Sequence, residues 1–401
     1  MSQNSPVNPV QSTLPRPLSA RSQIDSFIVM DVMSAAAAAE AAGQEVLHLE
    51  VGQPGTAAPS TALAALRDRM AQENLGYTVA CGLPDLRSRI SQHYADHYSV
   101  IVPPERIVIT SGSSAGFVLS FLAAFNPGDR LAVPSPGYPC YRQTPHALGL
   151  ETVPLVTGPE DRWMPTPDML RDAARNQGIA GALIASPANP TGTMMDPERL
   201  RDIIRVCEAE RLWYLSDEIY HGLSYGLEEQ TALAYSDACI VINSFSKYFS
   251  MTGWRIGWMV VPAEMVSTVE RLTQNLYIAA STASQVAALG AFDGRAELEA
   301  NREVYQRNRD LLINGLPCVG LDRIVPADGG FYLYVDVSAY TDDSLEFTRQ
   351  MLDEVGVAAT PGLDFDPDRG GRYVRLSYAG PTDVMQRALS RLGEWDRLKS
   401  Q

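Results

Sequence analysis

The chain has 401 residues and a formal net charge of −15, with 45% hydrophobic and 20% charged residues. This acidic balance argues against partners such as nucleic acid or an anionic membrane surface, because both favour basic proteins. The five cysteines are scattered without a C-x-x-C pair, and the five histidines form no cluster with metal-ligand spacing. We therefore expect a cytoplasmic protein without a bound metal, and the length favours two domains.

The N-terminal region divides into a polar segment and a helix. Residues 1–20 are rich in Ser, Pro, Asn and Gln, which predicts a flexible arm rather than a signal peptide or a membrane span. Residues 24–42 follow an alanine-rich helical pattern that Gly43 ends, and residues 46–50 predict a short extended segment. We expect residues 21–47 to pack with a smaller C-terminal domain.

Short apolar runs of strand length alternate with helical patterns through the middle of the chain. The runs cover residues 106–110, 130–133, 151–155, 181–185, 211–216, 238–244 and 256–261. The helical patterns cover residues 61–73, 83–97, 113–125, 139–148, 166–176 and 197–210. Such alternation is typical of βαβ units and predicts an α/β fold with a mostly parallel central sheet and helices on both faces. We assign residues 48–295 to this large domain.

The character of the chain changes after residue 261, where strands become fewer and helices longer. We expect strands at 331–337 and 373–377 and helices at 263–292, 297–316, 344–354 and 381–398. These elements predict a smaller α+β domain over residues 296–401.

Lysine is rare in this chain, which draws attention to one central lysine. Of the 32 Lys and Arg residues only Lys247 and the near-terminal Lys399 are lysines. Arginine stays protonated in proteins, whereas a lysine whose pKa is lowered by burial or a neighbouring cation attacks carbonyl groups as a free amine. Arg255 is such a cation if the fold brings it close. An ordinary surface lysine is an equally open interpretation of the spacing alone.

Polar residues follow four of the predicted strands, at the positions where ligands bind in open α/β sheets. Residues 110–116 lie between a strand and a helix and predict an anion site at the helix N-terminus. Asn189, Asp217 and Lys247 each come shortly after a further strand. Each also has a plain interpretation as a cap, turn or solvated loop residue. Together they predict a phosphate cradle, an amide, a carboxylate and an amine along one edge of a sheet.

Pyridoxal phosphate requires this set of groups: a lysine for its aldehyde, an acid for its ring nitrogen, donors for its phenolic oxygen and an anion site for its phosphate. The relevant motifs are Gly52-Gln-Pro-Gly, Tyr77-x4-Gly-x3-Leu-Arg, Asn189-Pro-Thr-Gly, Asp217-Glu-Ile-Tyr, Ser244-Phe-Ser-Lys, Gly253-Trp-Arg-Ile-Gly and Tyr373-Val-Arg-Leu-Ser. With them the chain resembles the fold-type I pyridoxal-phosphate-dependent enzymes, specifically the class I/II aminotransferases, from about residue 21 onward. The resemblance implies exchange of an amino group between an L-amino acid and a 2-oxo acid by a ping-pong mechanism.

The resemblance also implies roles for individual residues. Lys247 would bind the cofactor aldehyde and then move the proton of the substrate α-carbon. Asp217 would keep the ring nitrogen protonated, while Tyr220 and Asn189 would hydrogen-bond the phenolic oxygen. Tyr138 would stack on the cofactor ring.

Further implied residues concern the phosphate, the substrate carboxylate and a second subunit. Those expected at the phosphate are Ser113, Ser114, Ser244 and Arg255. Arg375 would clamp the α-carboxylate as a bidentate fork, with contacts from Gly52 and Asn189. Tyr77 would reach the phosphate of the other subunit, which implies a homodimer. Relatives that act on acidic substrates carry a second cation for the distal carboxylate, and the sequence identifies none here.

Three alternatives differ in their chemistry. Residues 112–116 also match the G-x-S-x-G elbow of serine hydrolases, with Ser114 as nucleophile, although no histidine follows His221. A regulator built on the same cofactor fold would need a DNA-binding module, which neither residues 1–20 nor the acidic charge favours. A pyridoxal-phosphate-dependent lyase, acting by β-elimination or C–S cleavage, would use the same residues in its first steps.

Overall fold

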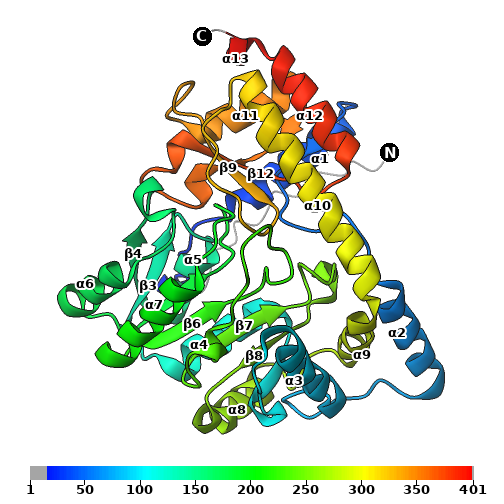
Figure 1. The fold of residues 1–401 in the computed structure, drawn as a ribbon, viewed down its shortest axis with the longest axis vertical. Helices are drawn as coiled ribbons and strands as arrows, with labels where there is room; N and C mark the ends of the chain where they lie inside the picture. Colours follow the sequence, from blue (N-terminus) through cyan, green and yellow to red (C-terminus); the bar gives the residue numbers. More distant parts are fainter. Residues whose placement is uncertain (1–15, 400–401) are drawn as a thin grey trace, which may run out of the picture.

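The computed structural model describes residues 16–399, so most of the predicted N-terminal arm lies outside the described residues. Its centre is a seven-stranded sheet with strand order β2-β8-β7-β6-β5-β3-β4 (Figure 1). The strands are β2 Ile107–Thr110, β3 Arg130–Ser135, β4 Glu151–Val156, β5 Gly181–Ala185, β6 Trp213–Asp217, β7 Ile240–Ser244 and β8 Gly257–Val260. In this sheet β8 runs opposite to the other six strands, so the predicted mostly parallel α/β sheet is confirmed.

Helices cover both faces of this sheet because its strands are apolar on both sides. Ile107 and Ile109 of β2 pack in the core layer of α3, α6 and α7, whereas Val108 packs in the layer of α4, α5 and α8. Continuous burial of this kind is expected of strands enclosed between two helix layers. The helices of this part are α2 Ser60–Gln72, α3 Pro84–Tyr98, α4 Gly112–Ala124, α5 Cys140–Leu148, α6 Pro167–Gln177, α7 Pro197–Glu210, α8 Val266–Leu276 and α9 Thr282–Ala291.

The C-terminal part forms a second core around a three-stranded antiparallel sheet, with strand order β11-β12-β9. Its elements are α10 Arg295–Gly315, β9 Tyr332–Asp336, α11 Ser344–Val355, β10 Val357–Ala358, β11 Thr360–Pro361, β12 Tyr373–Ser377, α12 Thr382–Glu394 and α13 Asp396–Lys399. The N-terminal elements α1 Ile28–Ala41 and β1 Leu47–His48 join this part, since β1 pairs with β10 and α1 contacts β11 and α11 (Figure 1). The domain boundaries at residues 47 and 295 stay predictions.

Two helices predicted as continuous are each interrupted in the structure. Residues 263–292 form α8 and α9 rather than one helix, because Ile278 adopts a positive φ of 70° and the Ser281 side chain caps the new helix at the Ser284 N–H. The predicted helix over residues 381–398 is interrupted at Trp395, whose backbone is extended. Among residues 16–399, no helix is both long enough and apolar enough to cross a membrane.

Candidate active site

The carboxyl ends of the parallel strands meet at one edge of the central sheet, where a cavity of about 550 Å³ opens. Strands β5, β6 and β7 end at this edge, α4 begins there after β2, and β8, which runs the other way, starts there next to Arg255. The predicted residues that line the cavity are Gly52, Ser113, Ser114, Tyr138, Asn189, Asp217, Tyr220, Lys247, Arg255 and Arg375. Ser244 and Tyr77 are not among its lining residues.

Lys247 is held as a reactive amine. Its Nζ donates a hydrogen bond to the Gly52 carbonyl oxygen at 2.6 Å and lies over the Tyr220 ring, 5.6 Å from the centroid. Burial lowers the pKa of Lys247 to about 7, helped by the positive charges of Arg375 and Arg255 and opposed by Asp217. A large fraction of this amine is therefore uncharged near neutral pH, as a nucleophile requires.

Asp217 is the last residue of β6 and its side chain is buried. Its Oδ1 accepts the Ile219 backbone N–H at 3.0 Å, and its Oδ2 accepts the hydroxyl of Tyr141. Burial raises the pKa of Asp217 to about 6, although both hydrogen bonds favour the carboxylate. Asp217 forms no ion pair among residues 16–399, so this buried carboxylate lacks a cationic partner within the described chain.

The first turn of α4 forms an anion site with Arg255. No side chain caps the N-terminus of α4 and no acidic residue lies in its first turn, so its backbone N–H groups are left for a ligand. Gly112 has a φ of +74°, and a Cβ there would lie 2.3 Å from Nη2 of Arg255. Only glycine therefore permits this close approach of the guanidinium to the turn.

Ser244 is positioned differently from the other predicted phosphate residues. Its Oγ lies 2.9 Å from the Ser246 Oγ and 3.1 Å from the Ile256 carbonyl oxygen, within the protein. Ser246, which the sequence analysis did not single out, lines the cavity instead. A phosphate contact from Ser244 stays a prediction.

Arg375 brings a buried guanidinium to the far side of the cavity from β12. Its Nη1 donates to Asn189 Oδ1 at 3.0 Å, and its Nη2 donates to the Glu50 carbonyl oxygen at 2.6 Å and to Thr360 Oγ1 at 3.1 Å. Its buried Nε has no hydrogen-bond partner within residues 16–399. Because Asn189 accepts through its oxygen, its amide NH₂ remains as a donor for a ligand oxygen.

A tyrosine pair completes the centre of the site. The hydroxyl groups of Tyr220 and Tyr332 are 2.9 Å apart, and Arg375 lies over the Tyr332 ring, 4.4 Å from its centroid. A Cβ on Gly52 would lie 2.0 Å from the Tyr332 hydroxyl, so this approach also requires glycine. The alternation of side chains along β9, paired with β12, offered a signal for Tyr332, because Tyr334 is paired with Arg375 and residues 332 and 334 therefore share the face of Arg375.

An apolar part of the cavity wall comes from the N-terminal helix and its flanks. Tyr138 packs edge-to-face with Tyr141 and with Phe27, with centroid distances of 5.5 and 5.7 Å. The apolar residues from α1 and its flanks that line the cavity are Phe27, Val29, Met30, Met33 and Val51. The sequence carried no signal for these contacts, since a helical pattern does not tell which distant cavity a helix face covers.

The serine hydrolase alternative has no support in this geometry. Ser114 lies in the first turn of α4, and no histidine or carboxylate among residues 16–399 hydrogen-bonds its hydroxyl. A nucleophilic serine needs such a base within hydrogen-bond reach.

Comparison with known proteins identifies one family for nearly the whole chain. Residues 44–392 match the family "Aminotransferase class I and II". The chain is 45% identical to the valine–pyruvate aminotransferase of Mycobacterium tuberculosis, over 94% of this chain and 97% of that protein. It is 32% identical to the aspartate/prephenate aminotransferase of Thermus thermophilus, over 87% of this chain and 90% of that protein.

A solved structure supports the same assignment. The crystal structure of an aminotransferase from Mycobacterium tuberculosis superposes with a TM-score of 0.94 at 45% identity, covering 96% of this chain and all of that one. Nothing in these comparisons favours a lyase or a serine hydrolase. The chain therefore belongs to the class I and II aminotransferases and is an amino-group-transferring enzyme.

Proposed function

We propose that this aminotransferase binds pyridoxal phosphate at the sheet edge and passes the amino group of an apolar L-amino acid to a 2-oxo acid by a ping-pong mechanism. The observation that carries the proposal is the charge inventory of the cavity. Among the residues that line it, the cations are Lys247, Arg255 and Arg375, and the carboxylate is Asp217. Each of the four has one role in the reaction, and no cation is left for an acidic side chain.

The donor set fits this cofactor. A buried carboxylate without a cationic partner suits a protonated ring nitrogen, and an uncapped helix N-terminus beside Arg255 suits a phosphate. Asn189 and Tyr220 lie between them with an amide NH₂ and a hydroxyl for a phenolic oxygen. Pyridoxal phosphate, when bound, supplies an aldehyde that condenses with amines and a ring that takes up the electrons of a broken Cα–H bond.

The chain's own residues then divide the work of one half-reaction. Lys247, as an uncharged amine, would bind the cofactor aldehyde, and its Nζ, when not bound there, would accept the α-proton of the substrate. Arg375 would orient the substrate through its α-carboxylate, since it lines the cavity and its guanidinium is a planar fork of N–H donors. The apolar wall from α1 excludes water from the reacting carbon.

The apolar wall also supports the choice of substrate. An amino acid whose α-carboxylate rests on Arg375 extends its side chain toward apolar residues, which favours valine-like over aspartate-like substrates. The valine–pyruvate aminotransferase of Mycobacterium tuberculosis carries the same preference in its name.

In cells, the five cysteines fit the reducing cytoplasm, because all of them are free.

A homodimer is part of the proposal. Tyr77 is 86% exposed and Val79 60% exposed, and Thr282 donates a hydrogen bond to the Gly76 carbonyl oxygen at 2.5 Å, which holds this segment beside the start of α9. Leu276 and Ile278, just before α9, are also about half exposed. A second copy that covers this apolar surface would bring Tyr77 to the other subunit's cofactor.

A half-reaction screen tests the proposal. The cofactor-loaded enzyme is mixed with single amino acids, and the visible spectrum of the bound cofactor and the 2-oxo acid product are followed. We expect valine, leucine or alanine to react with kcat/KM at least about tenfold above aspartate and glutamate, because a buried unpaired carboxylate is costly. Faster reaction with aspartate would contradict the substrate assignment, and no amino-group transfer to the cofactor by any amino acid would contradict the reaction.

A further inference from the structure

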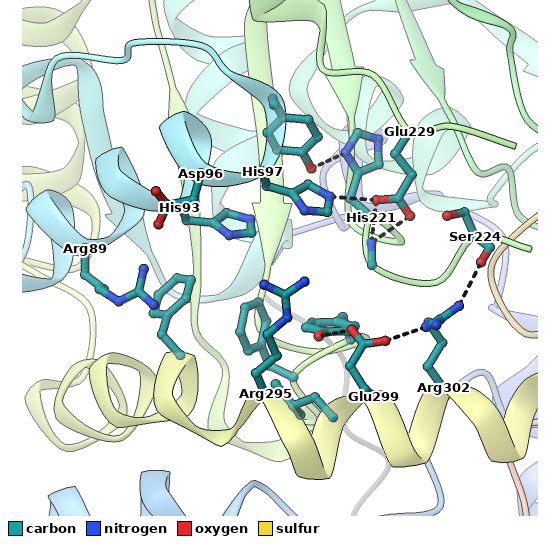
Figure 2. Close-up of a pocket in the computed structure, with 16 residues that line it drawn as sticks. Arg89, His93, Asp96, His97, His221, Ser224, Glu229, Arg295, Glu299 and Arg302 are labelled. Carbon is teal, nitrogen blue, oxygen red and sulfur yellow. Dashed lines mark hydrogen bonds and ion pairs between the residues drawn. The ribbon is translucent and has the colours of Figure 1, made fainter.

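A second cavity, of about 360 Å³, shares no lining residue with the active-site cavity (Figure 2). Its walls come from α3, from the segment after Tyr220, from the residues after Lys247 and from the start of α10. None of the motifs discussed above assigns a role to it. Its lining is rich in charged and imidazole groups, so the state of each charge decides what the cavity can bind.

The two carboxylates that face the inside of this cavity are already satisfied. Glu229 accepts the Gly222 backbone N–H at 2.7 and 2.8 Å and the His97 Nε2 at 3.3 Å. Glu299 accepts the Tyr248 hydroxyl at 2.7 Å and the Arg302 Nε at 2.8 Å. Neither carboxylate therefore needs a cation from a ligand.

Asp96, the third carboxylate of the lining, accepts the side-chain amide of Gln92 at 2.7 Å on the exposed side of α3. Gln92 lies one turn before Asp96 on the same helix, and Asp96 itself is exposed. It places little negative charge inside the cavity, because an exposed carboxylate is screened by water.

Two guanidinium groups have no hydrogen-bond acceptor within residues 16–399, although the charge of Arg295 also acts on Glu299. Arg89 packs over the Phe292 ring, 4.5 Å from its centroid, and neither Arg89 nor Arg295 forms a hydrogen bond or an ion pair within residues 16–399. Figure 2 shows Arg295 rising from α10 toward the rings of His93 and His97, with Arg89 on the α3 side of the same space.

His93 adds a neutral donor between these arginines. Its ring stacks on His97 at 5.5 Å and makes no hydrogen bond within residues 16–399. Burial is the main reason that the pKa of His93 falls to about 3, with further contributions from His97 and Arg89. The imidazole is therefore uncharged near neutral pH and offers one N–H to a ligand.

We propose that this cavity is a second, non-catalytic binding site for a small dianion that carries phosphate or carboxylate groups. Two planar guanidinium forks and an imidazole N–H line a space in which both inward carboxylates, Glu229 and Glu299, already accept hydrogen bonds from the protein. Guanidinium groups bind phosphate and carboxylate oxygens in a bidentate manner, and two of them suit two negative charges. The aromatic rings of Tyr248, Phe249 and Phe292 would enclose the ligand's carbon skeleton.

Isothermal titration of the cofactor-loaded enzyme tests the site, with inorganic phosphate and malonate as probes and chloride at equal ionic strength as the reference. The test variant is Arg89→Gln/Arg295→Gln. The matched control is Arg67→Gln/Arg307→Gln, which removes the same charge from side chains that are 76% and 61% exposed and lie outside the cavity. The control separates loss of this site from the general effect of lost positive charge. Both variants keep Arg375, so any malonate bound there contributes equally to the two titrations.

We expect saturable binding of at least one probe by the wild type and the control, and at least about tenfold weaker binding by the test variant, because each lost charge-assisted hydrogen bond costs a large factor. Binding of phosphate alone identifies a phosphate ligand, and binding of malonate alone a dicarboxylate. Equal affinity in the test and control variants, or no saturable binding of either probe, overturns the proposal. If the double variant does not fold, Arg295→Gln alone carries the same comparison, since Arg295 is exposed at the start of α10.

Discussion

Arg375→Lys is the substitution that most sharply tests how the substrate is held. Arg375 is 2% exposed and lines the cavity, and its terminal nitrogens donate to Asn189, Glu50 and Thr360, which leaves one N–H of Nη1 for the α-carboxylate. Lysine keeps the positive charge but is shorter and cannot present two parallel N–H groups. The substitution therefore removes the pair of parallel N–H donors while it preserves the positive charge.

The expected loss follows from the bonds that lysine cannot replace. One charge-assisted hydrogen bond is worth about 1.5–3 kcal/mol, so the loss of one arm of the fork lowers kcat/KM by about 10- to 150-fold. Since the carboxylate is bound in both the ground state and the transition state, most of this loss appears as a higher KM. The Glu50 carbonyl loses its bond to Arg375 but keeps the Thr360 hydroxyl as a donor, so the free energy of unfolding should fall by about 0.5–1.5 kcal/mol.

Single-turnover kinetics of the half-reaction, measured against substrate concentration, separate these effects from cofactor loss. Arg372→Lys is the matched control, because Arg372 precedes the same strand and is exposed. It should behave as the wild type. Arg375→Lys with kcat/KM within about threefold of the wild type, or an equal loss in the Arg372→Lys control, would refute this reasoning on the carboxylate clamp.

Three further outcomes concern the amine, the carboxylate and a tight glycine. Asp217→Asn should lower kcat by at least about 10²-fold, whereas Tyr141→Phe should lower it by about tenfold or less, because it removes only a hydroxyl that donates to Asp217. Steady-state rates compare the two variants, and equal losses of kcat would contradict a role for the negative charge of Asp217. Lys247→Met should stabilise the apoprotein at pH 7 by up to about 4 kcal/mol, because the folded pKa of about 7 lies below an unfolded value of about 10.4. Between these pH values the unfolded wild type binds more protons than the folded one, so wild-type stability rises with pH and the advantage of methionine should vanish by about pH 10. A stability difference between wild type and Lys247→Met that does not change with pH in denaturant titrations would argue against the lowered pKa of Lys247. Gly52→Ala should lower the free energy of unfolding by about 1–3 kcal/mol, since its Cβ would lie 2.0 Å from the Tyr332 hydroxyl, while Gly76→Ala, with open space around it, should change it by less than about 0.5 kcal/mol.

The sheet edge could be predicted because it follows from connectivity alone. Once the apolar runs are assigned as parallel strands, Asn189, Asp217 and Lys247 must lie at neighbouring strand ends, and the structure brings all three to one cavity. Arg375 is different, since it comes from an antiparallel strand of the C-terminal part and reaches the site only through packing between distant segments. Its role came from the motif resemblance and not from strand spacing.

Other features depend on tertiary contacts that no local pattern encodes. Tyr141 reaches Asp217 from α5, and the apolar wall is contributed by α1, far away in sequence. The break between α8 and α9 arises because Ile278 takes a backbone conformation that its side chain disfavours, so local propensity predicted a continuous helix. Ser246 was overlooked because the Ser244-Phe-Ser-Lys motif offers two serines that are both buried, and the motif alone does not tell which one lines the cavity.

Reductive trapping tests the central assignment most directly, because it asks which amine holds the cofactor aldehyde. The cofactor-loaded enzyme is reduced with sodium borohydride, digested with trypsin and analysed by mass spectrometry. Lys247 is the only tryptic site between Arg211 and Arg255, so its modification yields an uncut peptide of residues 212–255 that carries the reduced cofactor. This account predicts the label on Lys247 and none on Lys399. Label on Lys399, or no covalent label at all, would contradict it.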